Sequence, residues 1–151
     1  MRTLHAEIEI EAPAERVWQV LTDLDSYSQW NPFLQMISGV LEPDQYLRVC
    51  IKPPGARGMT IKPRVIAVEE NTGFSWIGHI LFPGIFDGEH YFIIDPLDEN
   101  RCRFVQGELF TGLLAIPILW LIRKGTRRGF EAMNQALKAR VESDPHSEGT
   151  E

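Results

Sequence analysis

The stretch IEIEAPAERVWQVLTDLDSYSQWNPF, residues 8–33, decides the fold. Its start completes an alternation of apolar and polar residues that begins at Leu4, which is typical of a half-buried strand. Pro13 is suited to the first turn of a helix, because a residue there needs no N–H partner. Apolar side chains then recur at helical spacing: Val17, Trp18, Leu21 and Leu24. The stretch therefore predicts a strand followed by a short amphipathic helix.

The end of the stretch, DSYSQWNPF, predicts a second short helical turn. Asp25 or Ser26 can cap that turn, and Pro32 disfavours a helical conformation at the preceding residue. The chain is thereby directed into a strand that starts at Phe33. Trp30 and Phe33 are large apolar residues in a turn, and we expect them to bury against the rest of the fold.

In the remaining chain the spacing of apolar residues changes once, from strand-like to helical. Between residues 33 and 111, six strand-like runs are separated by Pro, Gly, Asp and Asn, and their short connections favour antiparallel hairpins. A long helix follows, from about residue 117 to residue 142, with one apolar stripe formed by Phe130, Met133, Leu137 and Val141. The order predicts an α+β fold in which an antiparallel sheet of about seven strands is covered by the C-terminal helix.

Composition limits the classes of function. With 151 residues we expect one domain over residues 1–143 and a disordered tail over residues 144–151. The formal charge of -6 argues against nucleic-acid binding, which requires a basic surface. Two cysteines without CxxC spacing, and no secretory signal, favour a cytoplasmic protein. The apolar run over residues 113–122 contains a proline and is too short to be a transmembrane segment.

Four segments together resemble the START-like helix-grip superfamily (SRPBCC), in its polyketide cyclase/dehydrase and lipid-transport branch. They are the opening stretch, then GEHYFIID, RFVQGELFTG and RGFEAMNQALKARVE, and the resemblance covers about residues 3–142. It implies a curved sheet that grips the C-terminal helix, with two short helices after the first strand closing one end of an apolar cavity. It also implies a hydrophobic or amphipathic ligand such as a lipid, quinone or polyketide. Members include aromatic polyketide cyclases, carriers and activators of chaperones, so the resemblance does not imply one chemistry.

The two strand-like runs before the final helix carry the candidate polar residues. Strand parity places His90 on one face with phenylalanines, and it places Gln106 and Glu108 on one face of the next run. A hairpin between the runs brings all three to one surface, with His90 opposite either Gln106 or Glu108. His90 and Glu108 are therefore candidates to orient a polar group of a ligand, or to transfer protons in a cyclisation or dehydration. The alternative is a hydrogen bond that ties two strands together in a filled core.

The candidate ligand-binding set adds aromatic residues to these three polar ones. Trp30 and Phe33 would act as plug residues at the cavity end, and the other aromatic candidates are Trp76, Phe92, Phe110 and Trp120. Plain core packing is the competing interpretation for each of them. No cofactor is expected, and no metal site, because the sequence brings no trio of metal ligands together around any of the four histidines.

The start of the C-terminal helix is unusual because residues 118–122, ILWLI, are apolar on all sides. We expect loops to bury them; the alternatives are exposure to a ligand, to a partner subunit in a homodimer, or to a membrane surface. A basic cluster follows, formed by Arg123, Lys124, Arg127 and Arg128, which suits anionic lipid or a solvated face. Our primary hypothesis is a binding or carrier protein for a hydrophobic small molecule. The alternatives are a cyclase or dehydratase that uses His90 and Glu108, and a protein-interaction module.

Overall fold

The computed structural model describes residues 2–143. The N-terminal elements are β1 (Arg2–Ile10), α1 (Ala14–Thr22), a 3-10 turn η1 (Leu24–Ser26) and α2 (Tyr27–Trp30). The strands that follow are β2 (Leu34–Ser38), β3 (Arg48–Ile51), β4 (Met59–Ile61), β5 (Arg64–Glu69), β6 (Gly73–Ile80), β7 (Phe86–Asp98) and β8 (Arg101–Thr111). The long helix α3 (Ala115–Glu142) completes the described chain. The predicted tail, residues 144–151, lies outside the described residues.

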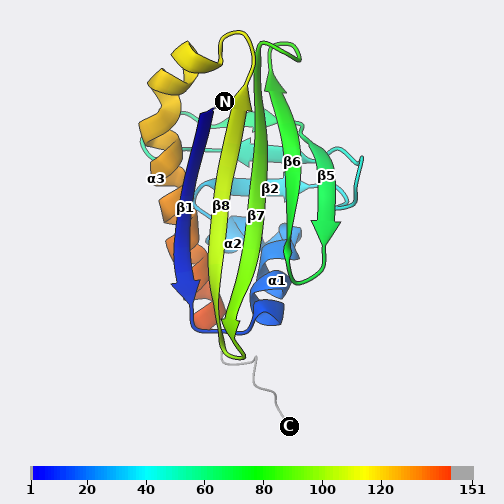
Figure 1. Cartoon of the computed structure of the whole chain (residues 1–151), viewed down its shortest axis with the longest axis vertical. Coiled ribbons are helices and arrows are strands. Elements are labelled where there is room, and N and C mark those ends of the chain that lie inside the picture. Colours follow the sequence, from blue (N-terminus) through cyan, green and yellow to red (C-terminus); the bar gives the residue numbers. More distant parts are fainter. Residues whose placement is uncertain (1, 144–151) are drawn as a thin grey trace.

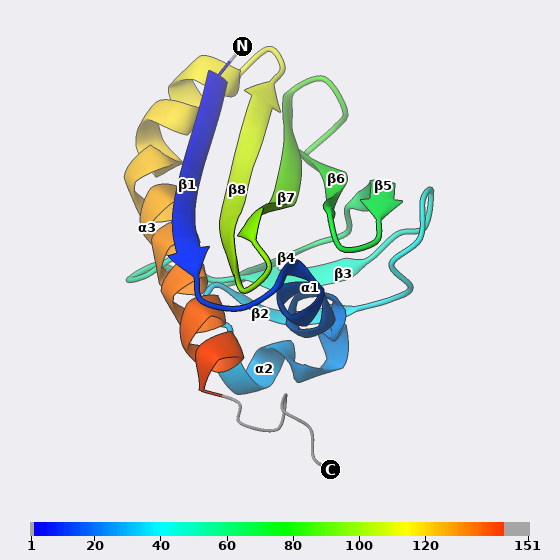
Figure 2. The ribbon, with the colours of Figure 1, turned by 60° about the horizontal axis from the view of Figure 1, so that its bottom comes forward.

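The strands form two antiparallel sheets that together enclose the core. The larger sheet has the order β1-β8-β7-β6-β5, and the smaller has the order β2-β3-β4. Figure 1 shows that the strands of the small sheet lie behind the large one and run across it, with α3 beside β1. Figure 2 shows α1 and α2 closing the end of the molecule at which β1 finishes. This arrangement is the predicted α+β helix-grip fold, and the two short helices after the first strand are confirmed.

The structure has eight strands among residues 2–143 rather than about seven, because one expected strand divides. The run MTIKPRVIAVE becomes β4 and β5, which belong to different sheets. Pro63 lies between them; it has no N–H for a sheet ladder, and its carbonyl oxygen accepts a hydrogen bond from Leu47 N at 2.9 Å. The chain therefore leaves the small sheet and enters the large one at this proline.

The turn that ends α2 is held differently from the prediction. Ser26 precedes α2, but its side chain makes no cap bond; its Oγ donates to Asp23 Oδ2 at 2.7 Å instead. The Asn31 side chain supplies the turn, since its Oδ1 accepts hydrogen bonds from Phe33 N and Leu34 N, each 2.9 Å long. The Asn31 side chain thus accepts the hydrogen bonds of two backbone N–H groups where β2 begins, in place of a neighbouring strand.

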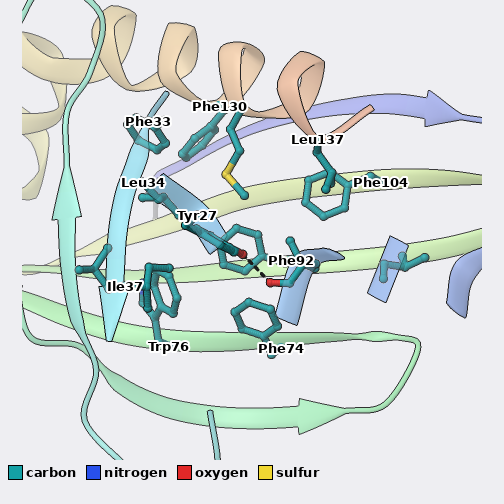
Figure 3. Close-up of a cluster of buried hydrophobic side chains, with 14 of the residues drawn as sticks. Tyr27, Phe33, Leu34, Ile37, Phe74, Trp76, Phe92, Phe104, Phe130 and Leu137 are labelled. Atoms are coloured by element: carbon teal, nitrogen blue, oxygen red, sulfur yellow. Dashed lines mark hydrogen bonds between the residues drawn. The ribbon is translucent and has the colours of Figure 1, made fainter. Parts of the chain in front are cut away.

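Aromatic side chains dominate the core between the sheets and α3. Figure 3 shows Tyr27 and Phe33 from the turn region facing Phe130 of α3 and Trp76 and Phe92 of the large sheet. Tyr27 is fully buried, and its hydroxyl donates to Leu21 O at 2.6 Å, so its polar atom is satisfied. Phe33, which was expected to bury, is therefore part of the core together with Tyr27.

The inward stripe of α3 is the one that the sequence predicts. Phe130, Met133 and Leu137 are completely buried, and Val141 is nearly so. The outward side of the first turns is different: Trp120 is 68% exposed and Leu121 75% exposed. The expectation that loops bury residues 118–122 is wrong for these two, because the connection before α3 packs on the end of the sheet and leaves the outer side uncovered. Within residues 2–143, no helix has both the length and the apolar composition needed to cross a bilayer.

Candidate functional site

A cavity of about 180 Å³ lies between α3, the small sheet and one half of the large sheet. Its walls are mostly apolar and come from β3, β4, β6, β7, β8 and α3, with Phe33 at one side. Larger hollows on the surface have charged or polar residues in their walls, such as the one of about 460 Å³ lined by Glu11 and residues 98–101. An apolar cavity with a few polar groups is the usual form of a small-molecule site.

The polar groups of this cavity come from the β7–β8 hairpin. Strand pairing sets His90 directly opposite Glu108, and Phe92 opposite Gln106. This is one of the two registers that the sequence allowed. His90 and Glu108 both line the cavity, whereas Gln106 lies two pairs further along the hairpin, behind His90.

A chain of buried hydrogen bonds fixes the His90 ring from behind. His90 Nε2 and Gln106 Oε1 are 3.0 Å apart. The Gln106 amide donates to Asn134 Oδ1 at 2.7 Å and to the Phe130 carbonyl oxygen at 3.4 Å. Gln106 is completely buried and Asn134 nearly so, which makes these bonds stronger than they would be in water. Helix α3 is thus linked through Gln106 to the cavity wall.

This network determines which nitrogen of the neutral imidazole carries the proton. Both acceptors near the Gln106 nitrogen are carbonyl oxygens, so the amide must face them with its NH2 group. Its oxygen then faces His90, and His90 Nε2 must carry the proton that it donates. In the neutral ring, Nδ1 is left with a free lone pair. That nitrogen is directed to Glu108, whose Oε1 is 3.7 Å away.

Glu108 occupies a space that a glycine provides. A Cβ at Gly88 would overlap the Glu108 carboxyl group, so any larger residue there would displace it. The Glu108 side chain is 21% exposed, and burial raises the pKa of its carboxyl group to about 8. At neutral pH this group is predominantly a carboxylic acid, which can donate a hydrogen bond.

The surroundings of His90 also favour its neutral form. Burial lowers the pKa of the imidazole to about 4, and this effect outweighs the hydrogen bond to Gln106, which raises it. The ring stacks on Phe92 with centroids 4.4 Å apart, and Trp76 and Phe130 lie at 5.5 Å and 5.1 Å. The pair is therefore an uncharged acid and an uncharged base, held at 3.7 Å, which is too long for a direct hydrogen bond.

Comparison with protein families identifies the chain. The family model described as polyketide cyclase / dehydrase and lipid transport matches residues 1–142. The chain belongs to this family. No curated protein sequence matches it. Family membership agrees with the observed helix-grip fold, and it supports a role in ligand binding or in cyclisation without deciding between them.

Solved structures with the same fold have low sequence identity to this family member. The Zhui aromatase/cyclase from a Streptomyces species aligns with a TM-score of 0.79 and 18% identity, over 99% of both chains. A START superfamily protein from Mycobacterium smegmatis aligns with a TM-score of 0.69 and 20% identity, over 93% of this chain and 97% of that one. Norcoclaurine synthase from Thalictrum flavum aligns with a TM-score of 0.72 and 14% identity, over 95% and 96%. At these identities the likeness concerns the fold.

The structure of this family member divides the nine candidate ligand-binding residues into three groups. Five of them line the cavity: Phe33, Trp76, His90, Glu108 and Phe110. Phe92 and Gln106 are buried behind the wall, where they support His90. Trp30 and Trp120 lie outside the cavity, so their proposed contact with a ligand there is not supported.

The two tryptophans lie elsewhere for different reasons. Trp30 is half-buried against Tyr27, with ring centroids 5.0 Å apart, and forms part of the core cap at the α2 end. Trp120 follows Leu119, which is buried, and one residue corresponds to a rotation of about 100° around a helix. Its side chain is therefore on the outward side of α3.

Sequence reasoning missed three parts of the site. Asn134 was overlooked, although it is four residues after Phe130 on the same apolar stripe, where a polar residue signals a buried partner. Thr126, on the same stripe, lines the cavity, and so do Ile118 and Ile122 from the first turns of α3. The walls from β3 and β4 could not be found, because they depend on how the small sheet stacks. Within residues 2–143, no group of three His, Cys, Asp or Glu side chains is placed to hold a metal ion.

Proposed function

We propose that this protein binds a small hydrophobic molecule with one polar group in the cavity, in a binding or carrier role. The observation that carries the proposal is an apolar cavity whose inner wall presents an uncharged His90–Glu108 pair. A neutral hydroxyl or carbonyl group on an apolar ligand could hydrogen-bond to this pair without placing a charge in the cavity.

The volume favours a ligand portion of about one ring. An apolar engineered cavity of about 150 Å³ accepts benzene, and this cavity has about 180 Å³. The aromatic side chains Phe33, Trp76 and Phe110 on its walls suit contact with a planar ring. A phenol or an aryl ketone fits both the wall and the polar pair, and a longer molecule would place the remainder at the cavity mouth.

The first test compares phenol with toluene, which have similar shapes and differ at the polar group. Binding to the wild type and to Glu108→Met is measured by NMR titration of backbone amides. The ratio of phenol to toluene affinity should fall by about 2- to 10-fold in the variant, which is the usual range for one hydrogen bond. Equal ratios in the two proteins, or shifts confined to residues outside β6–β8 and α3, would contradict the proposal.

A second candidate function is proton transfer in an aldol-type cyclisation or dehydration. It is favoured by one specific observation: the free lone pair of His90 Nδ1 faces a carboxyl group that burial keeps protonated. In the cyclisation, His90 would accept a proton from a carbon next to a carbonyl, that carbon would bond to a second carbonyl carbon, and Glu108 would donate a proton to the alkoxide so formed. In the dehydration, the base would take a proton from the adjacent carbon and the acid would protonate the hydroxyl group that leaves as water. Both side chains are uncharged at neutral pH, and their roles are complementary: His90 is the general base and Glu108 is the general acid.

Turnover of a linear precursor of an aromatic polyketide tests this second function. The ring-closed product should form with the wild type and be lost with His90→Ala, and the rate should decrease above about pH 8 as Glu108 ionises. Binding of the precursor without product, in the wild type as in the variant, would leave the carrier role as the better account.

A further inference from the structure

The end of the molecule where α3 begins carries a group of exposed apolar side chains, which we call the apolar tip. Its members are each between 59% and 80% exposed: Leu81, Phe82, Leu113, Ile116, Trp120 and Leu121. Single exposed apolar residues are normal on a soluble protein, but a group of this size on one end marks an interaction surface.

The apolar tip is one surface although it comes from two segments of the chain. Leu81 and Phe82 belong to the β6–β7 connection, and the other members belong to the β8–α3 connection and the start of α3. Hydrogen bonds join the two segments, from Leu113 N to Gly84 O and from Leu114 N to Ile85 O, each 2.8 Å long. Figures 1 and 2 both show the two segments at the same end of the molecule.

A basic stretch lies next to the apolar tip on the outward side of α3. Arg123, Lys124, Arg127 and Arg128 line a hollow of about 390 Å³ with Leu4 and Glu131. Residues 115–128 contain these four basic side chains and no acidic one, in a protein with a net charge of -6. The charge of this helical segment therefore has the opposite sign to that of the molecule.

The spacing of the two features matches the layers of a lipid surface. The centre of the apolar group on α3 and the centre of the basic stretch are about seven residues apart, which corresponds to about 10 Å along the helix. Interfacial segments bury apolar side chains about 5–10 Å into the boundary between headgroups and acyl chains, while basic side chains meet the phosphates. With the apolar tip inserted, the basic stretch lies at headgroup level.

We propose that the apolar tip and the basic stretch dock the protein on an anionic lipid membrane. Each Lys or Arg near such a surface adds to the electrostatic attraction, and insertion of the apolar side chains adds the hydrophobic contribution. A second copy is a poorer partner for this surface. A symmetric dimer through it would bring two sets of four cations together, with no acidic patch opposite them.

Docking in this way would bring the cavity mouth to the lipid surface, a consequence that rests on the proposed ligand binding. Ile80 lines the cavity and precedes Leu81 of the apolar tip. Ile118 and Ile122 line it from α3, while Trp120 and Leu121 between them face outward. A hydrophobic ligand could then pass between acyl chains and cavity with little exposure to water.

Vesicle co-sedimentation of the whole chain tests the docking. Vesicles of phosphatidylcholine alone are compared with vesicles that also contain phosphatidylglycerol, at low and high salt. The wild type should pellet with the anionic vesicles, and added salt should weaken this binding. Trp120→Ser and the charge reversal Lys124→Glu/Arg128→Glu should each reduce binding by about tenfold or more. Tryptophan emission of the wild type should shift to the blue when anionic vesicles are added, and that of Trp120→Ser should not, since the Trp120 indole moves from water into the interface.

Two matched variants serve as controls. Met36→Ser removes an exposed apolar side chain of β2, and Arg48→Glu reverses an exposed charge of β3. Both should pellet like the wild type. Circular dichroism confirms folding, and phenol titration of Trp120→Ser separates the two proposals, because docking should be lost while binding in the cavity is retained.

Two results would overturn the docking: absence of binding to either kind of vesicle, and equal loss of binding in the control variants. If vesicle binding is absent and the protein forms a concentration-dependent dimer that Trp120→Ser abolishes, the apolar tip is a dimer interface instead.

Discussion

His90 and Glu108 face each other directly across β7 and β8, with Nδ1 of the imidazole 3.7 Å from Oε1 of the carboxyl group. Burial opposes the charged form of both, so the pair is neutral rather than an ion pair at pH 7. The free energy of unfolding should record this, because each group binds protons differently in the folded and unfolded states.

We expect the stability of the wild type to decrease between about pH 6.5 and pH 8. Folding raises the pKa of Glu108 from 4.5 to about 8, so the folded state holds a proton that the unfolded state has lost, and stability decreases as pH rises through this window. His90 has the opposite effect between pH 4 and 6.5, because its pKa is lowered from 6.5 to about 4. The two effects cancel between about pH 4.5 and 6.5 and leave the Glu108 slope above it.

Urea unfolding at a series of pH values measures this slope. It should approach about 1.4 kcal/mol per pH unit at most, and Glu108→Gln should remove it, since the amide does not titrate. A wild-type curve parallel to that of Glu108→Gln from pH 6.5 to 8 would contradict a protonated Glu108.

Asn134→Leu should change the tautomer of His90 from a distance. Without the Asn134 oxygen, the Gln106 NH2 group loses its 2.7 Å partner and keeps only the longer, 3.4 Å bond to the Phe130 carbonyl oxygen, so the amide can rotate more easily and present NH2 to His90. The proton should then move from Nε2 to Nδ1, and the variant should lose about 1–3 kcal/mol of stability. The ¹⁵N shifts of the imidazole nitrogens report the tautomer. Gln135→Leu, on the exposed side of the same helix, is the control and should leave these shifts unchanged.

Two glycines of α3 should respond to alanine with opposite signs. At Gly129 a Cβ would overlap the Phe33 ring, so Gly129→Ala should cost about 1–3 kcal/mol and move a side chain that lines the cavity. At Gly125 the nearest atom to a new Cβ is Pro53 Cβ at 3.7 Å, an ordinary contact. Gly125→Ala should therefore stabilise by about 0.5–1 kcal/mol through helix propensity. Thermal unfolding of both variants decides this; a Gly129→Ala variant as stable as Gly125→Ala would mean that α3 does not pack on Phe33 as described.

Gly88→Ala should displace the Glu108 carboxyl group, because a Cβ there would occupy its position. The carboxyl group would move toward solvent, its pKa would fall, and the preference for phenol over toluene would be reduced. Gly78 pairs with Gly88 across β6 and β7, and a Cβ at Gly78 would make only a 3.5 Å contact with Ile61 Cδ1. Gly78→Ala is therefore the matched control for the pKa of Glu108, measured by NMR titration. An unchanged pKa in Gly88→Ala would show that Glu108 has another place in the cavity.

The polar part of the candidate site follows from sequence because strand parity is a local property. Residues His90, Gln106 and Glu108 are fixed on one face by the period of two, and the length of the β7–β8 connection limits the register to two choices. The inward stripe of α3 follows from its helical period in the same way.

Other features depend on contacts between elements that periodicity does not describe. The division of one expected strand at Pro63 requires knowledge that two sheets exist. The exposure of Trp120 depends on whether any loop covers α3, and the support of Phe92 behind His90 depends on the depth of the cavity. Amphipathic patterns identify which side of an element is apolar, but they do not reveal what lies against an element that is apolar all round.

The three-residue strand β4 forms part of the cavity wall through Met59 and Ile61, and it is an edge strand that pairs only with β3 within the small sheet. An edge strand of this length has few hydrogen bonds to lose, so its amides should exchange with deuterium far sooner than those of β7 and β8. We therefore expect a ligand portion larger than the 180 Å³ cavity to be accommodated by displacement of β4, at the free-energy cost of its few hydrogen bonds to β3.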